Sequence, residues 1–164
     1  MTSVLIAGVG GQGSIFAARV LGTTALRHNL NVRGSETIGM AQRGGSVVSH
    51  VRMAPRDGAI EIASPLTPPG KVDVLVALHP VEGERSRHFL CEGGLLVCCT
   101  DEQRNDIMQA CGAKSLNAAM LGLAAAMGAF PFGVDDLAET LRTFGKAQFA
   151  ELNLKALYMG AEMR

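Results

Sequence analysis

The chain has 164 residues, of which 48% are hydrophobic and 18% charged, and its 15 basic residues balance 15 acidic ones. This length predicts one domain over residues 1–164, large enough to bury a core without disulfides or metals. Basic residues form no cluster of the kind that nucleic-acid binding requires. No apolar run is long enough to span a membrane, and no basic leader precedes the first apolar segment, so we expect a cytoplasmic protein.

The four cysteines do not have the spacing of a metal or cluster site. They are Cys91, Cys98, Cys99 and Cys111, and no pair forms a C-x-x-C motif. Adjacent residues on a strand point to opposite faces, which would separate Cys98 from Cys99. We therefore expect buried, reduced thiols and no metal or other cofactor on this chain.

The first part of the chain predicts a strand, a glycine turn, a helix and a second strand. Residues 4–7 form a short apolar run typical of a strand buried on both faces of a parallel sheet. Glycines follow, and residues 14–28 have helical periodicity, before a second strand at residues 31–35. This order predicts an α/β fold, a single three-layer domain with a mostly parallel, Rossmann-like sheet.

A hairpin is predicted next. Residues 46–53 alternate between two faces, with His50 and Arg52 on the same face. The Asp57-Gly58 pair is a hairpin signal, so residues 59–63 are expected to return as a paired strand. Residues 65–70, with three prolines, are expected to form an irregular loop.

The remainder predicts two more buried strands and a set of C-terminal helices. The strands are expected at residues 72–78 and 95–99, the second beginning after Gly93-Gly94 interrupts the chain. Helices are expected at residues 80–90 and 101–110, and residues 117–127 are apolar nearly all round, as in a core helix. Two amphipathic helices follow, the last with Phe149, Leu152, Ala156 and Met159 on its apolar face.

The glycine turn has the spacing of a dinucleotide-binding motif. Its residues fit G-x-G-x-x-G between a strand and a helix, and they are Gly8, Gly10, Gly11, Gln12 and Gly13. Such glycines bring backbone close to a phosphate at a helix N-terminus. Arg33 would then suit a 2′-phosphate and Glu36 a ribose hydroxyl. Alternatively, the glycines only allow the strand and helix to pack closely.

A second segment is more specific. The run GMAQRGGSVVSHVR at residues 39–52, together with the glycine turn, resembles the gamma/beta-type small subunits of pyruvate, ketoisovalerate and indolepyruvate ferredoxin oxidoreductases. Within that family the small subunit of indolepyruvate oxidoreductase is the most similar type. Looser similarities continue at residues 77–82, 93–97 and 117–122. Two departures stand out: His79 replaces a usually acidic residue, and residues 100–117 form a shorter segment than usual.

This resemblance implies an α/β accessory subunit of an enzyme that converts a 2-oxoacid and coenzyme A to acyl-CoA and CO2. Thiamine diphosphate, magnesium and iron–sulfur clusters would lie on catalytic partner subunits, and electrons would reach ferredoxin through them. No residue of this chain is then expected to be catalytic. The 2-oxoacid, the contact with coenzyme A, the stoichiometry and a homodimer are left open.

The glycine-rich segment supplies the expected substrate, coenzyme A or interface loop. Its residues, with those of the strand that follows, are Gly39, Met40, Gln42, Arg43, Gly44, Gly45, Ser46, His50 and Arg52. Arg43 offers a planar fork of donors for a carboxylate or phosphate, or else satisfies carbonyls in a subunit interface. Gln12 is expected to link the glycine turn to this loop.

Two further hypotheses stay beside the accessory subunit. The glycine turn alone is compatible with a stand-alone NADP-binding oxidoreductase. A non-enzymatic docking protein derived from the same family is the other alternative.

Overall fold

The sheet is built around β1 (Thr2–Val9), whose apolar interior residues are fully buried. The computed structural model describes residues 1–38, 44–144 and 147–164. Strand β1 pairs in parallel with β4 (Val72–Ala77), which pairs in parallel with β5 (Leu90–Cys98). Continuous apolar runs are suited to this arrangement because helices cover both faces of these strands. The predicted α/β fold is confirmed.

The other half of the sheet is antiparallel. Strand β3 (Ser46–Pro55) lies between β1 and β2 (Leu30–Ile38) and runs antiparallel to both, which gives the order β2-β3-β1-β4-β5. The sheet is therefore mixed, with its parallel part confined to β1, β4 and β5. Strands β2 and β3 supply the hairpin of the fold, at a different place from the one predicted.

The hairpin predicted around Asp57-Gly58 is wrong. Residues 59–63 form no strand, and Asp57 instead accepts a hydrogen bond from the Ala59 N–H at 3.0 Å, closing a local turn. Strand β3 already pairs with β1 along one edge and with β2 along the other. No edge of β3 is left for a returning strand, so the segment leaves the sheet.

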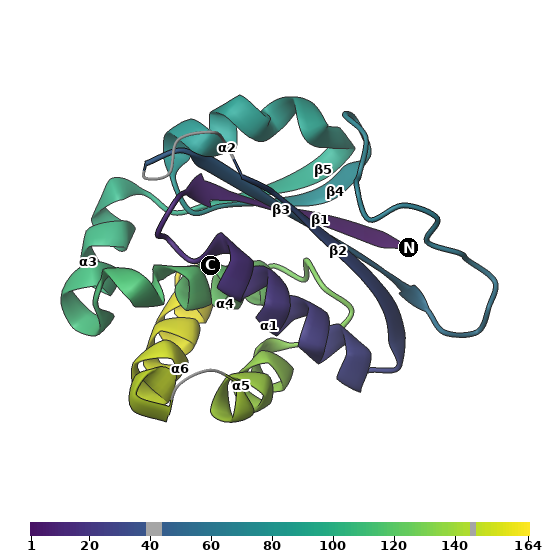
Figure 1. Cartoon of the computed structure of the whole chain (residues 1–164). Coiled ribbons are helices and arrows are strands. Elements are labelled where there is room, and N and C mark those ends of the chain that lie inside the picture. The colour runs from purple at the N-terminus through teal and green to yellow at the C-terminus, as the bar shows by residue number, and fades with distance from the viewer. Residues whose placement is uncertain (39–43, 145–146) are drawn as a thin grey trace.

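The helices form two layers (Figure 1). On one face lie α1 (Ser14–Arg27) and α4 (Leu116–Ala126), and α3 (Asp101–Cys111), α5 (Val134–Thr143) and α6 (Ala147–Glu162) pack around them. On the other face α2 (Pro80–Ser86) and a 3-10 turn (Arg87–Phe89) cover β1, β4 and β5. A further 3-10 turn (Ala113–Ser115) precedes α4. None of the described helices is long and apolar enough to cross a membrane.

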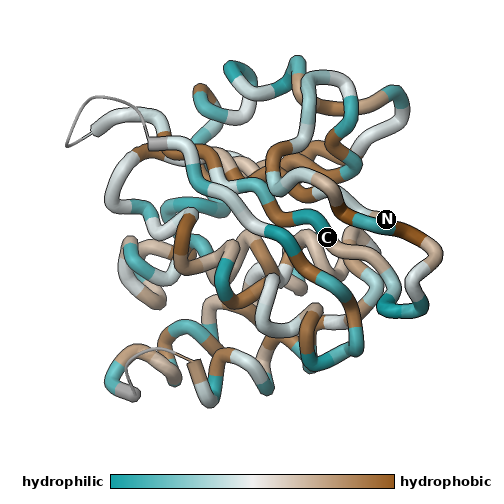
Figure 2. The backbone as a smooth tube through the Cα atoms, turned by 45° about the vertical axis from the view of Figure 1, so that its right-hand side comes forward, coloured by the Kyte–Doolittle hydropathy of each residue, from teal (hydrophilic) through white to brown (hydrophobic). Residues whose placement is uncertain are grey.

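Two separate cores result from this layering. The larger lies between the sheet and α1 and α4, and the smaller lies under α2 and contains Leu5, Ala7, Val72 and Leu75. In Figure 2, hydrophobic residues, coloured brown, occur along the strands that cross the middle of the molecule. Burying apolar surface on both faces stabilises these strands at roughly 25 cal/mol per Å².

Strand β5 does not begin after Gly93-Gly94, as predicted, but runs through them. Val72 pairs with Leu90 while Val74 pairs with Leu95, so extra residues of β5 bulge out between these pairs. Gly93 has a φ of 75°, and a Cβ on Gly94 would lie 3.0 Å from the Val72 carbonyl oxygen. The glycine pair therefore permits a bulge rather than ending the strand.

Helix α6 packs on α4 through two glycines. A Cβ on Gly160 would overlap the Ala119 carbonyl, and one on Gly122 would overlap the Leu157 carbonyl. The predicted apolar face of this last helix is only partly correct, because Ala156 is fully buried but Leu152 is 41% exposed. The close contact uses the second half of α6, and the first half leaves its apolar side chains at the surface.

We predict that Gly160→Ala destabilises the chain by about 3 kcal/mol, because the new methyl group must push two helix backbones apart. Thermal and urea unfolding measure the change. The matched control is Gly22→Ala in α1, where the nearest atom to the new Cβ is Val32 Cγ1 at 3.5 Å. That control should be neutral or stabilise by up to about 1 kcal/mol through helix propensity. Equal melting temperatures for the two variants would contradict this account of the α4–α6 contact.

Candidate functional site

The glycine turn between β1 and α1 is closed by its own polar groups. Gln12 Oε1 accepts a hydrogen bond from the Val9 N–H at 2.8 Å, and the Gln12 N–H donates to the Val9 carbonyl at 3.0 Å. Asn117, at the start of α4, donates from Nδ2 to the Gln12 carbonyl at 3.1 Å and is only 4% exposed. A Cβ on Gly13 would overlap this amide, so the turn needs glycine there for close approach.

The start of β3 lies directly beside this turn. The Gly10 N–H donates to the Gly45 carbonyl at 2.8 Å, and Val9 lies opposite Ser46 in the β1–β3 register. Gly44, Gly45 and Ser46 therefore adjoin the glycine turn. Among the described residues, the backbone hydrogen bond from Gly10 to Gly45 links the two segments. Of the other predicted residues of this segment, Gly39, Met40, Gln42 and Arg43 lie outside the described residues.

His79 lies at the same edge, where β4 ends. The Leu78 N–H donates to the Ala7 carbonyl at 2.8 Å, so the end of β4 stays paired with β1. His79 Nδ1 accepts a hydrogen bond from the Val81 N–H at 3.3 Å and caps the N-terminus of α2. His79 thus has a structural role here, while Val81 is 56% exposed beside it.

Two shallow hollows flank Gly11. One, of about 270 Å³, is lined by residues that include Arg104 and Met108, and the other, of about 230 Å³, by residues that include Phe16 and Phe149. Lys114 lines both and lies 5.7 Å from the centre of the Phe149 ring. Met108 and Phe149 are exposed, so the surface around the glycine turn combines apolar side chains with positive charge.

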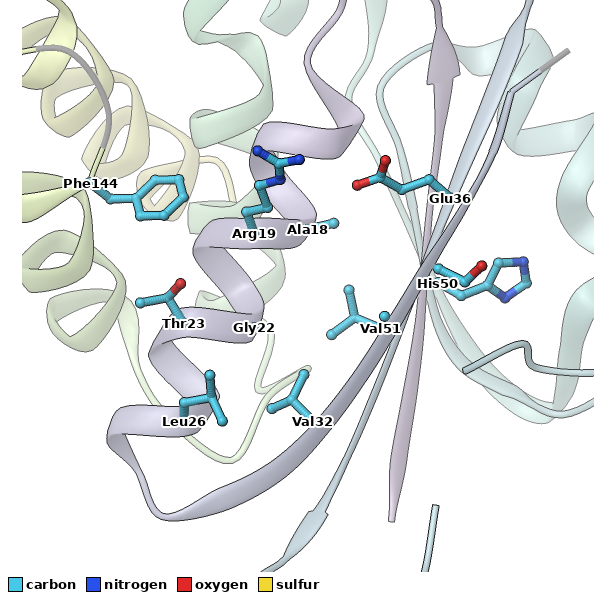
Figure 3. A pocket seen from close by; sticks show the side chains of 12 residues that line it. Ala18, Arg19, Gly22, Thr23, Leu26, Val32, Glu36, His50, Val51 and Phe144 are labelled. Atoms are coloured by element: carbon cyan, nitrogen blue, oxygen red, sulfur yellow. The ribbon is translucent and has the colours of Figure 1, made fainter. Parts of the chain in front are cut away.

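The two residues predicted to recognise NADP lie on opposite faces of β2. Glu36 lines a pocket of about 710 Å³ between α1 and β2, where its carboxylate points toward α1 and Arg19 (Figure 3). Arg33 lines a different hollow with Arg56. Strand β3 also separates β2 from β1, whereas dinucleotide folds place the second strand next to the first. The structure therefore does not bring Arg33, Glu36 and the glycine turn together.

His50 and Arg52 lie away from the glycine turn on the face of β3 toward α2. His50 is four residues beyond Ser46, about 13 Å along the strand. Its imidazole points away from α1 (Figure 3), and Nδ1 accepts a hydrogen bond from the Thr67 N–H at 3.2 Å. Arg52 donates from Nη1 to the Ser64 carbonyl at 2.8 Å. Both residues thus hold the loop before β4.

The environment of His50 favours the neutral ring. Burial first, and then the positive charge of Arg52, lower the pKa of His50 from its ordinary value of 6.5. The Thr67 N–H donates a hydrogen bond to Nδ1, so the proton of the neutral ring is on Nε2.

The cysteines do not form a ligand set for a cluster. The Cys111 thiol contacts Met159 in the core, and burial raises the pKa values of Cys98 and Cys99, which disfavours the thiolate that a metal needs. Among the residues that the structure describes, no three His, Cys, Asp or Glu side chains are close enough to hold a metal ion.

Comparison with known families assigns the whole chain to one of them. The family model described as pyruvate ferredoxin/flavodoxin oxidoreductase matches residues 3–163. The chain belongs to this family. Indolepyruvate oxidoreductase subunit IorB of Archaeoglobus fulgidus is 31% identical over 96% of this chain and 92% of its own length. That alignment spans 192 positions, more than the chain's 164 residues, so the relative carries additional segments.

Other proteins are similar to this chain over part of its length or in fold. Indolepyruvate oxidoreductase subunit IorB of Thermococcus kodakarensis is 42% identical over 57% of this chain and 44% of its own length. The gamma subunit of the keto/oxoacid ferredoxin oxidoreductase of Geobacter sulfurreducens has a TM-score of 0.78 at 24% identity, over 99% of this chain and 97% of its own. The 2-oxoglutarate:ferredoxin oxidoreductase of Magnetococcus marinus also has a TM-score of 0.78, at 19% identity, over 99% of this chain and 30% of its own.

Sequence reasoning missed Asn117 as the residue that holds the glycine turn. The available signal was a polar residue at the start of an otherwise apolar helix, because a buried polar side chain needs a hydrogen-bond partner. It also missed Thr67 as the partner of His50. No local pattern indicated that contact, since the proline-containing loop gives no periodicity to interpret.

We predict that His50 makes the folded chain less stable as the pH falls below about 6.5. In that range the unfolded state takes up the proton that the folded state, with its lower His50 pKa, does not. His50→Asn, which keeps an acceptor near the position of Nδ1, should make the decrease in the free energy of unfolding shallower. Urea unfolding between pH 5 and about 7.5 measures it. The exposed His88→Asn is the control, and equal pH dependence in wild type and His50→Asn would contradict the prediction.

Proposed function

We propose that this chain is an accessory subunit of a thiamine diphosphate-dependent 2-oxoacid:ferredoxin oxidoreductase. The complex would convert a 2-oxoacid and coenzyme A to acyl-CoA and CO2 in the cytoplasm and pass electrons to ferredoxin. The chain's part is to dock on the catalytic partner subunits and complete their site. The observation that carries this proposal is the family match over residues 3–163, together with an IorB relative matched over 92% of its length.

The edge around the glycine turn is the surface we assign to docking. It gathers the glycine turn, the segment from Gly44 to Ser46 and the end of β4 at the carboxyl ends of the parallel strands, where open α/β sheets carry their functional sites. Exposed Val81, Met108 and Phe149 surround it. Exposed large apolar side chains gathered in one region are typical of protein interfaces.

The proposal assigns the cofactors to the partner subunits. Thiamine diphosphate, magnesium and iron–sulfur clusters would be held there. The raised pKa values of Cys98 and Cys99, which burial causes, make these two thiols poor cluster ligands and support this assignment. This chain's own polar groups at the docking edge are largely used within the fold: Gln12 and Asn117 close the glycine turn, and the Gly10 N–H binds Gly45. The edge is therefore a preformed surface, suited to positioning a neighbouring chain.

Co-purification tests the proposal. We expect a tagged form of this chain, expressed in its own cell, to retain a large chain that contains thiamine diphosphate and iron–sulfur clusters. Met108→Asp and Phe149→Asp should each lower the retained amount about tenfold or more, because a charge is buried in the interface. Ile60→Asp, at an exposed apolar residue remote from the glycine turn, is the control. A chain that purifies alone and binds NADPH saturably would overturn the proposal in favour of a stand-alone NADP-binding oxidoreductase.

A second test concerns Arg43 in the glycine-rich segment. If it binds a carboxylate or phosphate at the composite site, Arg43→Ala should lower the turnover of the assembled complex about tenfold or more while the free chain melts as before. Arg43→Lys should restore little, because an ammonium cannot reproduce a forked contact. Turnover is measured at saturating subunit, beside a thermal melt. Full turnover of an assembled Arg43→Ala complex would remove Arg43 from the site.

A further inference from the structure

A pocket of about 650 Å³ lies on the face of the sheet that carries α2, in front of β3. Helix α2 covers the neighbouring strands, and the loop of residues 64–71 passes over β3 and forms one wall of the pocket. In Figure 1 this loop leaves the sheet on the side of the N-terminus, away from the glycine turn. The volume is in the range of pockets that hold small molecules.

The pocket has positive charge and no negative charge in its lining. Arg52 and Lys71 both line it, and none of the described residues that line it is acidic. The nearest acid in the sequence, Asp73, accepts a hydrogen bond from the Ser3 N–H at 2.7 Å and contacts the Cys91 thiol. Two cations without a carboxylate between them create a field that favours an anion.

His50 adds a neutral donor to this charge. Because Nδ1 accepts from the Thr67 N–H, the ring proton is on Nε2. The imidazole stands edge-on to the Phe89 ring, with their centres 5.8 Å apart, so it is held in place from two sides. A fixed N–H beside two cations is the donor pattern that oxyanion sites use.

The polar groups of the pocket wall are incompletely satisfied within the chain. Arg52 donates from Nη1 to the Ser64 and Leu66 carbonyls and from Nη2 to the Met1 sulfur, but its Nε is buried without a partner. The Thr67 hydroxyl is also buried without a partner. Buried polar groups in folded proteins nearly always have partners, so such orphans call for a cause. Opposite them, the wall is apolar and consists of Leu66, Pro68, Pro69 and Phe89.

From this arrangement we infer that the pocket binds a small organic anion, with its carboxylate or phosphate at Arg52, Lys71 and His50 and its apolar body against Phe89 and the prolines. The site lies on this chain alone and does not depend on the proposed role as an accessory subunit. It is separate from the glycine turn, which adjoins the first residue of β3, whereas His50 and Arg52 lie in the middle of the strand. A ligand there would join the loop of residues 64–71 to the sheet.

Titration of the purified chain with two anions tests the site. The probes are inorganic phosphate and phenylacetate, with benzyl alcohol as the uncharged analogue, in a buffer free of other carboxylates and phosphates. Calorimetry gives the affinity, and the imidazole signals of 13C-histidine-labelled protein give the location, since the His50 signal is identified by its loss in His50→Asn. We expect both anions to shift the His50 signal, phenylacetate to bind more tightly than phosphate, and benzyl alcohol to shift nothing.

Matched variants test whether phenylacetate binding depends on the cations of this pocket. Arg52→Met and Lys71→Met should each weaken phenylacetate binding about tenfold or more, through loss of a charged hydrogen bond. Arg56→Met, which removes a cation from a different hollow, should leave the affinity within about twofold. Arg52 also holds the loop, so the affinity of Arg52→Met is interpreted only if this variant has the melting temperature of the wild type. If it does not, the affinity of Lys71→Met, a change at an exposed residue, decides the test.

The possible results either support or overturn the anion site. Binding of only one anion supports the site and identifies its oxyanion. The inference is overturned if neither anion shifts the His50 signal, if benzyl alcohol binds as tightly as phenylacetate, or if Lys71→Met binds phenylacetate as the wild type does.

Discussion

The hydrogen bonding of β3 along both of its edges is the constraint on which the rest of the structure depends. Because β3 runs antiparallel between β1 and β2, its first residues must lie beside the last residues of β1. This places Gly45 against Gly10 and unites two glycine-rich segments that are more than 30 residues apart in sequence. The same pairing moves β2 to the edge of the sheet and separates Glu36 from the glycine turn, so a dinucleotide-like sequence motif does not lead to a dinucleotide-like site.

Local patterns were sufficient for most elements but not for their pairing. The apolar runs of β1 and β4, the helical period of α1 and the apolar helix α4 all reflect burial that a short stretch of sequence reveals. The order of strands depends on contacts between distant segments. Asp57-Gly58 has the composition of a hairpin turn, yet the strand before it has no free edge. Gly93-Gly94 has the composition of a break, yet β4 continues to pair across it through a bulge.

The candidate site was predictable to the same extent. The two glycine-rich segments are visible in the sequence, and the alternation of β3 correctly places His50 and Arg52 on one face. What the sequence does not contain is the distance between them and the glycine turn, because that is set by the register in which β3 pairs with β1. Nor does it indicate that the loop of residues 64–71 folds back over His50 and Arg52. The loop makes these contacts through one backbone N–H, which bonds His50, and two backbone carbonyls, which bond Arg52, and backbone groups carry no sequence preference.

Strand β3 therefore serves two surfaces, one at its start and one at its middle. At its start, backbone groups of Gly44 to Ser46 join the glycine turn and form an edge whose exposed neighbours are apolar, a chemistry suited to another protein chain. Farther along, charged and polar side chains face an open pocket, a chemistry suited to a small anion. The strand is an interior strand of the sheet and is paired on both sides, so neither surface requires it to move. A substitution at one surface should then leave the other surface intact, because sites about 13 Å apart on a rigid strand with no shared partner act independently.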